Sequence, residues 1–252
     1  MVEITNLSAG YGKDNVLRNI NFIANKSEIT TIIGNNGCGK STLLKAVAGI
    51  LPISGGEILM NGNSITALTA AERAKQTAYL PQGKNTPDIT AGRMVLHGRF
   101  PYLSYPRKYR KADFEIADAA MAKMGISNLK NRPMAELSGG TRQKVYIAMA
   151  LAQCSPIIVM DEPTSYLDIG QQMKFVCITK ELAQSGKTVI LVLHDLLFAL
   201  KISNRICVME NGKILMQNTP KEILNSNIIK KLYGVEVRAL MTPEGEQYYY
   251  QM

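Results

Sequence analysis

One stretch decides how this chain folds: Ile32-Ile33-Gly34-Asn35-Asn36-Gly37-Cys38-Gly39-Lys40-Ser41-Thr42. A β-branched run from Ile29 leads into it and a helix-forming run, Lys40–Leu51, follows, so the sequence predicts a strand, a glycine-rich loop and a helix. The spacing G-x-x-x-x-G-K-[ST] is that of a phosphate-binding loop. Glycines let backbone N–H groups point inward around an anion, and the helix start adds the positive end of its dipole. A plain glycine-rich turn would not need this context.

We predict that every residue of this loop binds nucleotide. The set is Gly34, Asn35, Asn36, Gly37, Cys38, Gly39, Lys40, Ser41 and Thr42. Lys40 brings a full charge to the β- and γ-phosphates, and the Ser41 hydroxyl can ligate Mg²⁺, so ATP and Mg²⁺ are the expected ligands. Cys38 lies beside Lys40 and a helix N-terminus, where a thiolate is favoured. The alternative is that Cys38 is only a small residue that fits the loop.

Length and composition restrict the class of protein. A chain of 252 residues, 46% of them hydrophobic, can form one large α/β domain or two small ones. No apolar run approaches the ~18–20 residues of a membrane span, and the first residues lack a secretory signal. The four cysteines are scattered, as expected in a reducing compartment, so we expect a soluble, cytosolic chain.

The net charge of +9 indicates an anionic partner. The candidates are a nucleotide, anionic lipid headgroups and nucleic acid. The sequence has no aromatic-basic RNA motif and no recognition-helix pattern, so we expect no nucleic acid partner.

Alternating hydrophobicity predicts two antiparallel strands near the N-terminus, Val2–Leu7 and Val16–Ala24, joined through a loop at Ser8–Gly12. Tyr11 lies between two glycines of that loop and is expected to be exposed. It either stacks on a purine or is an ordinary turn tyrosine. From Pro87 to Ala152 helical periodicity replaces strands, which predicts an inserted helical subdomain.

The remaining pattern alternates strands with helices. Buried strands are predicted at Pro156–Met160 and Thr188–Leu193, helices at Ala70–Gln76, Asp168–Gln184 and Pro220–Leu232, and hairpins at Arg205–Met209 with Lys213–Met216 and Glu236–Met241 with Gln247–Gln251. We therefore predict an α/β fold over residues 1–252 as a single domain. It has a mostly parallel central sheet, an N-terminal antiparallel β subdomain and a helical insertion at about 87–152.

Four polar signals follow predicted strands, where a parallel sheet binds ligands: the loop from Gly34, Gln82, Asp161 with Glu162, and His194. A carboxylate after four apolar residues is costly unless it meets a cation, so we expect Asp161 to hold Mg²⁺ together with Ser41 and Gln82. Glu162 is placed to polarise a water aimed at the γ-phosphate. His194 is expected to contact the γ-phosphate. Through its amide, Gln82 can sense both Mg²⁺ and the γ-phosphate, although Gln82 by itself would be an ordinary loop residue.

In order and spacing, these motifs resemble the nucleotide-binding subunits of ATP-binding cassette transporters. The resemblance rests on Gly34–Thr42, Gln82, Leu137-Ser138-Gly139-Gly140, Ile157–Pro163, Ser165-Tyr166-Leu167-Asp168 and His194. Finer details, among them His97-Gly98-Arg99-Phe100-Pro101-Tyr102 and Tyr79-Leu80-Pro81-Gln82, are similar to importers of ferric siderophores, haem and cobalamin. Thr141 departs from the family, which usually has Gln there.

Ser138, Gly139 and Gly140, at a predicted helix N-terminus, form a second anion-binding device. The resemblance implies that they grip the ATP bound by another copy in a head-to-tail dimer, and that Asp168 acts across that interface. It also implies a transmembrane permease subunit that docks on the helical insertion, and indirectly a substrate-binding protein. The chain would then lie at the cytoplasmic face of the cell membrane, as a peripheral subunit.

Three alternatives stay open at this point. The first is an importer ATPase for another cargo, such as a metal ion or an amino acid. The second is a soluble ATPase of the same superfamily, but these usually carry two cassettes or a long coiled-coil insertion. The third is a small-molecule kinase, which would not need Leu137–Gly140. The cargo is not encoded in this chain.

Overall fold

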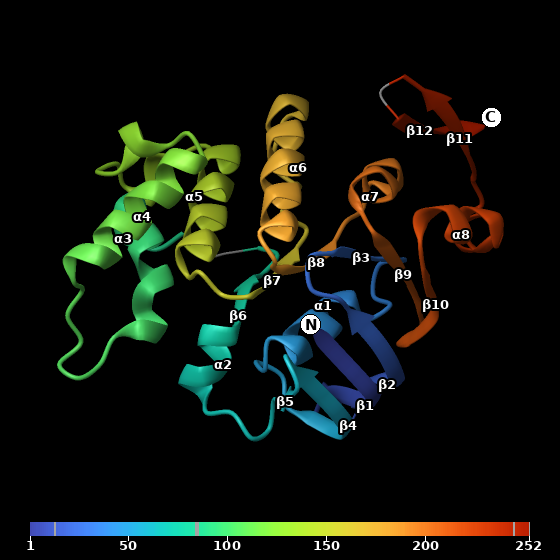
Figure 1. The fold of residues 1–252 in the computed structure, drawn as a ribbon, viewed down its shortest axis with the longest axis horizontal. Coiled ribbons are helices and arrows are strands. Elements are labelled where there is room, and N and C mark those ends of the chain that lie inside the picture. The colour runs from blue at the N-terminus through green and yellow to red at the C-terminus, as the bar shows by residue number, and fades with distance from the viewer. Residues whose placement is uncertain (13, 84–85, 244, 252) are drawn as a thin grey trace.

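A computed structural model describes residues 1–12, 14–83, 86–243 and 245–251. Its centre is a six-stranded sheet of order β10-β9-β3-β8-β7-β6, in which the pairs from β9 to β6 are parallel and β10 is antiparallel to β9 (Figure 1). The strands are β3 (Ile29–Gly34), β6 (Thr77–Leu80), β7 (Ile157–Asp161), β8 (Thr188–Val192), β9 (Arg205–Glu210) and β10 (Lys213–Asn218). The mostly parallel sheet predicted from the sequence is confirmed.

The continuous apolar runs of the central strands are explained by burial on both faces. In β7, Ile157 and Val159 belong to one buried cluster with α1 (Lys40–Val47), whereas Ile158 and Met160 belong to another. The second cluster contains residues of α6 (Ile169–Gln184) and α7 (Leu196–Ile202). Helices thus cover both faces, and the carboxyl ends of the strands remain at one edge.

The N-terminal sheet has the order β2-β1-β4-β5 and is antiparallel, as predicted. Its strands are β1 (Val2–Tyr11), β2 (Asp14–Ala24), β4 (Ile53–Met60) and β5 (Asn63–Ser64). The predicted loop at Ser8–Gly12 is wrong, because β1 continues through Tyr11. A Cβ on Gly10 would lie 1.8 Å from the carbonyl oxygen of Asp14, so the glycine serves close strand pairing and not a loop.

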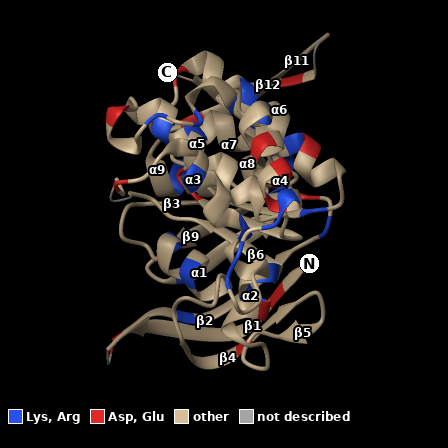
Figure 2. Cartoon of the chain, turned by 90° about the vertical axis from the view of Figure 1, so that its left-hand side faces the viewer, with Lys and Arg blue, Asp and Glu red and all other residues tan. Residues whose placement is uncertain are grey.

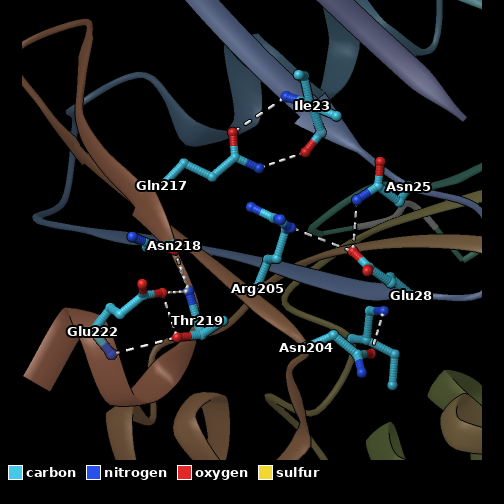
Figure 3. A network of polar contacts seen from close by, with 10 residues as sticks. Ile23, Asn25, Glu28, Asn204, Arg205, Gln217, Asn218, Thr219 and Glu222 are labelled. Carbon is cyan, nitrogen blue, oxygen red and sulfur yellow. Dashed lines mark hydrogen bonds and ion pairs between the residues drawn. The ribbon is translucent and has the colours of Figure 1, made fainter.

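Polar side chains tie this sheet to the central one (Figure 3). Gln217 of β10 accepts from the backbone N–H of Ile23 at 3.2 Å and donates to its carbonyl oxygen. Arg205 pairs with Glu28 at 3.4 Å just before β3 begins. Gln217 thus ties β10 to β2, and Arg205 ties β9 to the residue just before β3, the strand that leads into the phosphate-binding loop.

The helical subdomain lies to one side of the central sheet (Figure 1). Its helices are α3 (Ala91–Leu96), α4 (Lys111–Lys123) and α5 (Gly139–Ala152), with short 3₁₀ segments at His97–Tyr102, Ser127–Leu129 and Met134–Glu136. No strand element occurs within the described residues 86–152, as the helical periodicity predicted. One buried cluster runs from these helices to the sheet, so the two parts share a core.

Two predicted helices differ from the structure: one ends earlier than expected and the other is interrupted. Helix α1 stops at Val47 and not at Leu51, because Gly49 adopts a left-handed φ of 67°. The predicted helix Pro220–Leu232 is two helices, α8 (Pro220–Asn225) and α9 (Ile228–Tyr233), since Asn227 has a φ of 57°. Helix α2 (Ala70–Gln76) and the terminal hairpin of β11 (Glu236–Thr242) and β12 (Gly245–Gln251) agree with the predictions.

Candidate nucleotide-binding site

The phosphate-binding loop joins β3 to α1 and lines a cleft of about 330 Å³. The described residues around the cleft are Val16, Asn36, Gly37, Gly39, Lys40, Ser41, Thr42, Gln82, Glu162 and His194. Gly39 precedes α1 with a left-handed φ of 104°, no side chain caps the helix, and its first turn has no acidic residue. The first N–H groups of α1 are therefore available to an anion in the cleft.

Lys40 is buried, and its ammonium group is held over the loop. Nζ donates to the carbonyl oxygens of Gly34 at 2.7 Å and Asn35 at 3.0 Å. Gly34 and Asn35 thus act through Lys40, whereas the other loop residues except Cys38 line the cleft directly. Within the described part of the chain Lys40 forms no ion pair, so its charge can serve an anionic ligand.

Asp161 is the last residue of β7 and only 2% exposed. Burial raises the pKa of its carboxyl group above the ordinary value, and a hydrogen bond from Ser41 opposes that shift. Its Oδ1 atom is buried without a hydrogen-bond partner among the described residues. An unpartnered carboxylate oxygen beside a serine hydroxyl fits a hard divalent cation.

No group of three or more His, Cys, Asp or Glu side chains that could hold a metal occurs in the described ranges. A cation at Asp161 would be bound by one carboxylate and a hydroxyl together with phosphate oxygens, as is usual for Mg²⁺. Ser41, Asp161 and Gln82 are the residues that could contribute.

Gln82, Glu162 and His194 come from the ends of three different strands and meet at one carboxylate. Gln82 Nε2 donates to Glu162 Oε2 at 2.5 Å, and His194 Nε2 contacts Oε1. Ser165 Oγ, which sequence reasoning did not select, donates to Oε2 at 3.2 Å. The backbone of Glu162 has a left-handed φ of 50°, a conformation that is uncommon for a residue other than glycine. The sequence-predicted trio is therefore brought together.

Tyr11 lies at the end of β1 and is 50% exposed, as expected. Its hydroxyl accepts a hydrogen bond from Lys45 Nζ at 3.1 Å, and the ammonium lies 5.5 Å from the ring centroid. Tyr11 is not among the residues lining the cleft. Lys45 was missed, although its place four residues after Ser41 puts both on one face of α1.

The structure does not support the hypothesis that the side chain of Cys38 is a thiolate. The side chain is buried, and burial raises the pKa of its thiol, outweighing the opposite effect of Lys40. A Cβ on Gly34 would lie 2.8 Å from its sulfur. The small-residue interpretation is therefore the one the structure supports.

The Ser138 turn stands apart from the phosphate-binding loop. Ser138 is exposed and caps α5, its Oγ accepting from the N–H of Thr141 at 3.3 Å, so the family departure at Thr141 leaves the cap intact. A Cβ on Gly140 would lie 2.8 Å from the carbonyl oxygen of Tyr166. Gln143 donates to the carbonyl of Pro163 at 2.8 Å, which links α5 to the strand end that carries Glu162.

Asp168 caps α6, its Oδ1 accepting from the N–H of Gln171 at 2.8 Å, and it is exposed. The cleft at the phosphate-binding loop is not lined by Asp168, Ser138, Gly139 or Gly140. Within one copy, the described structure keeps the two anion-binding devices separate.

The parallel sheet, the glycine-rich loop before α1 and the acidic end of β7 define a P-loop nucleotide-binding protein. The chain belongs to the ABC transporter family, whose model matches residues 17–165. It is an ABC ATPase that binds ATP, and its hydrolysis of ATP drives transport.

One curated relative is the Probable siderophore transport system ATP-binding protein YusV of Bacillus subtilis (strain 168). It is 35% identical over 239 residues, which are 94% of this chain and 87% of the relative. Among solved structures, an ABC transporter described as of metal-chelate type, in an inward-facing conformation, has a TM-score of 0.84 at 26% identity and covers 100% of this chain and 97% of its own.

A dimeric post-hydrolysis structure of the ATP-binding cassette MJ0796, bound to ADP and Pi, has a TM-score of 0.78 at 27% identity. The similarity covers 87% of this chain and 99% of that one. In the part of this chain that the structure describes, no helix is long and apolar enough to cross a membrane.

Proposed function

We propose that this chain is the ATP-hydrolysing subunit of an importer for ferric siderophores or related iron chelates. The names of relatives such as YusV support this cargo class. The observation that carries the mechanism is the separation, within one copy, of the cleft from the exposed Ser138 turn. A second copy would complete each nucleotide site. Within each copy, residues 1–252 form one ATP-binding domain.

In this mechanism, the N–H groups of the loop and the Lys40 ammonium bind the phosphates of ATP, and Tyr11 stacks on the adenine. Ser41, Asp161 and Gln82 hold Mg²⁺, which neutralises phosphate charge when bound. Glu162 polarises the attacking water, since Gln82 and His194 hold its carboxylate at the edge of the cleft. His194, 49% exposed, also contacts the γ-phosphate.

The partner copy supplies Ser138, Gly139 and Gly140 to the γ-phosphate, and Asp168 lies across the interface. Tyr166 and Ile169, next to Asp168, are 64% and 76% exposed, as expected of residues that another copy covers. Binding of ATP favours the closed dimer and hydrolysis releases it. Moving such an equilibrium from 1:99 to 99:1 takes about 5.5 kcal/mol of differential affinity.

The helical subdomain, about 87–152, docks a cytoplasmic helix of a transmembrane permease subunit. Phe100, Tyr102 and Tyr105 are exposed on it, and the Arg107 guanidinium lies 4.7 Å from the Phe100 ring centroid. Lys and Arg residues are distributed over several elements, including α1 and β2 (Figure 2). The chain works at the cytoplasmic face of the membrane, and a substrate-binding protein delivers the cargo to the permease.

Uptake by cells tests this function. Replacing the native copy with the Glu162→Gln variant should lower uptake of radiolabelled ferric siderophores at least about 10-fold, because the variant cannot turn over. A Glu246→Gln replacement on the C-terminal hairpin is the control and should leave uptake unchanged. Normal iron uptake with lost uptake of a metal ion or an amino acid would favour the alternative cargo.

A further inference from the structure

The hydroxyl group of Tyr79 is buried and has no hydrogen-bond partner among the described residues. Tyr79 belongs to β6, and its side chain packs against the apolar cluster beneath α1. Buried hydroxyl groups nearly always have a hydrogen-bond partner in folded proteins. A buried hydroxyl group without one therefore indicates that a ligand, a water molecule or the shell of an ion binds there.

A second unpaired atom is Asp161 Oδ1, on the neighbouring strand. In the parallel register, Tyr79 pairs with Val159, and Val159 and Asp161 point to the same face of β7 because side chains alternate. The long tyrosine side chain therefore lies on the face of the sheet where Asp161 and Ser41 meet. A tyrosine hydroxyl is protonated at neutral pH and can donate a hydrogen bond.

The ammonium groups of Lys40 and Lys45, both on α1, oppose the effect of burial and lower the pKa of the Asp161 carboxyl group. Lys45 Nζ also donates to the Tyr11 hydroxyl at 3.1 Å. Lys45 and Ser41 occupy one face of α1, four residues apart. The buried carboxylate thus has the Ser41 hydroxyl and two lysine ammonium groups near it, and its Oδ1 still has no hydrogen-bond partner among the described residues.

We propose that the Tyr79 hydroxyl is a positioning residue for the divalent cation that accompanies the nucleotide, donating to the water shell that Asp161 Oδ1 also holds. This inference rests on the magnesium site of the proposed function. Groups that orient a metal's ligands or waters typically change metal affinity by about 10-fold or more when removed. Tyr79 would contribute through the cation and not through the phosphates.

The experiment measures how strongly Mg²⁺ improves nucleotide binding. The Kd of ADP is determined by calorimetry in EDTA and in saturating Mg²⁺, for the unchanged protein and for Tyr79→Phe. ADP lacks a γ-phosphate, so turnover does not disturb the measurement. Tyr248→Phe on the C-terminal hairpin is the matched control, because it removes the same hydroxyl far from β6.

We expect Tyr79→Phe to reduce the ratio of the two Kd values about 10-fold, with the Kd in EDTA and the urea midpoint of the metal-free protein unchanged. An unchanged ratio would overturn the proposal, and a lowered urea midpoint alongside it would assign the hydroxyl to a structural water.

The Asp161→Asn variant shows which of two proposals is wrong, the role of Tyr79 or the magnesium site at Asp161. If Asp161→Asn loses the Mg²⁺ effect while Tyr79→Phe keeps it, the site stands and the role of Tyr79 falls. If neither variant changes the ratio, the magnesium site of the proposed function falls as well.

Discussion

The N-termini of α1 and α5 both present helix N–H groups to an anion, but they are built differently. Helix α1 follows Gly39, has no side-chain cap, and carries the buried Lys40 as its first residue. Helix α5 follows Ser138, which caps the helix and is exposed. The cleft at α1 contains the buried charge of Lys40 together with Glu162 and His194. The start of α5 borders a separate cavity of about 140 Å³, lined by Gly139 and Arg142 and by none of those three residues, so we infer that it acts on a nucleotide that another copy brings.

The largest expected effect is that of a variant which keeps ATP bound, so that the α1 end of one copy and the α5 end of another stay on the same nucleotide. Glu162→Gln removes the group that polarises water, so ATP hydrolysis should fall about 10²- to 10⁴-fold while ATP stays bound. The variant should therefore accumulate as a dimer in Mg-ATP, measured by light scattering after gel filtration. Hydrolysis at the normal rate would contradict the assignment of Glu162.

The next pair of variants separates the two helix ends. Lys40→Ala removes a charge-assisted contact, so the Kd of ATP for the single chain should rise about 10- to 100-fold. Ser138→Glu should leave that Kd unchanged but abolish ATP-dependent dimerisation, because a carboxylate there repels the γ-phosphate. Calorimetry and light scattering measure the two effects. Equal loss of ATP binding in both variants would remove the distinction between the sites.

A smaller effect concerns how the α5 turn is held. Gly140→Ala would place a Cβ 2.8 Å from the Tyr166 carbonyl oxygen, so the free energy of unfolding should fall by about 1–3 kcal/mol. Gly139→Ala is the matched control, since its Cβ would be 3.7 Å from Tyr166 Cδ1, an ordinary contact. Urea unfolding compares the two. Equal stability would mean that the turn is not fitted against Tyr166.

The smallest expected effect is on the chemical labelling of Cys38, which lies in the phosphate-binding loop before α1. Cys38 is buried with a raised pKa, whereas Cys154 and Cys177 are exposed. N-ethylmaleimide should label Cys38 at least about 10-fold more slowly than the exposed thiols, as mass spectrometry of the peptides can measure. Fast labelling of Cys38 that ATP prevents would restore the thiolate hypothesis.

Much of the site was predictable because its residues follow patterns of short range. The spacing from Gly34 to Ser41 and the acidic pair after the apolar run of β7 both lie within a few residues, so local rules suffice. The β1 boundary was mispredicted because Gly10 resembles a loop residue. Only its contact with Asp14 shows that it serves strand pairing.

The sequence alone determined the α/β class, the phosphate-binding loop and the identities of Gln82, Asp161, Glu162 and His194, because local periodicity and motif spacing encode them. Tertiary structure alone decided which groups meet: Gln82, Ser165 and His194 at Glu162, Lys45 at Tyr11, and the raised pKa of Cys38. Those outcomes depend on burial and on contacts between residues up to 80 positions apart, which no local pattern contains.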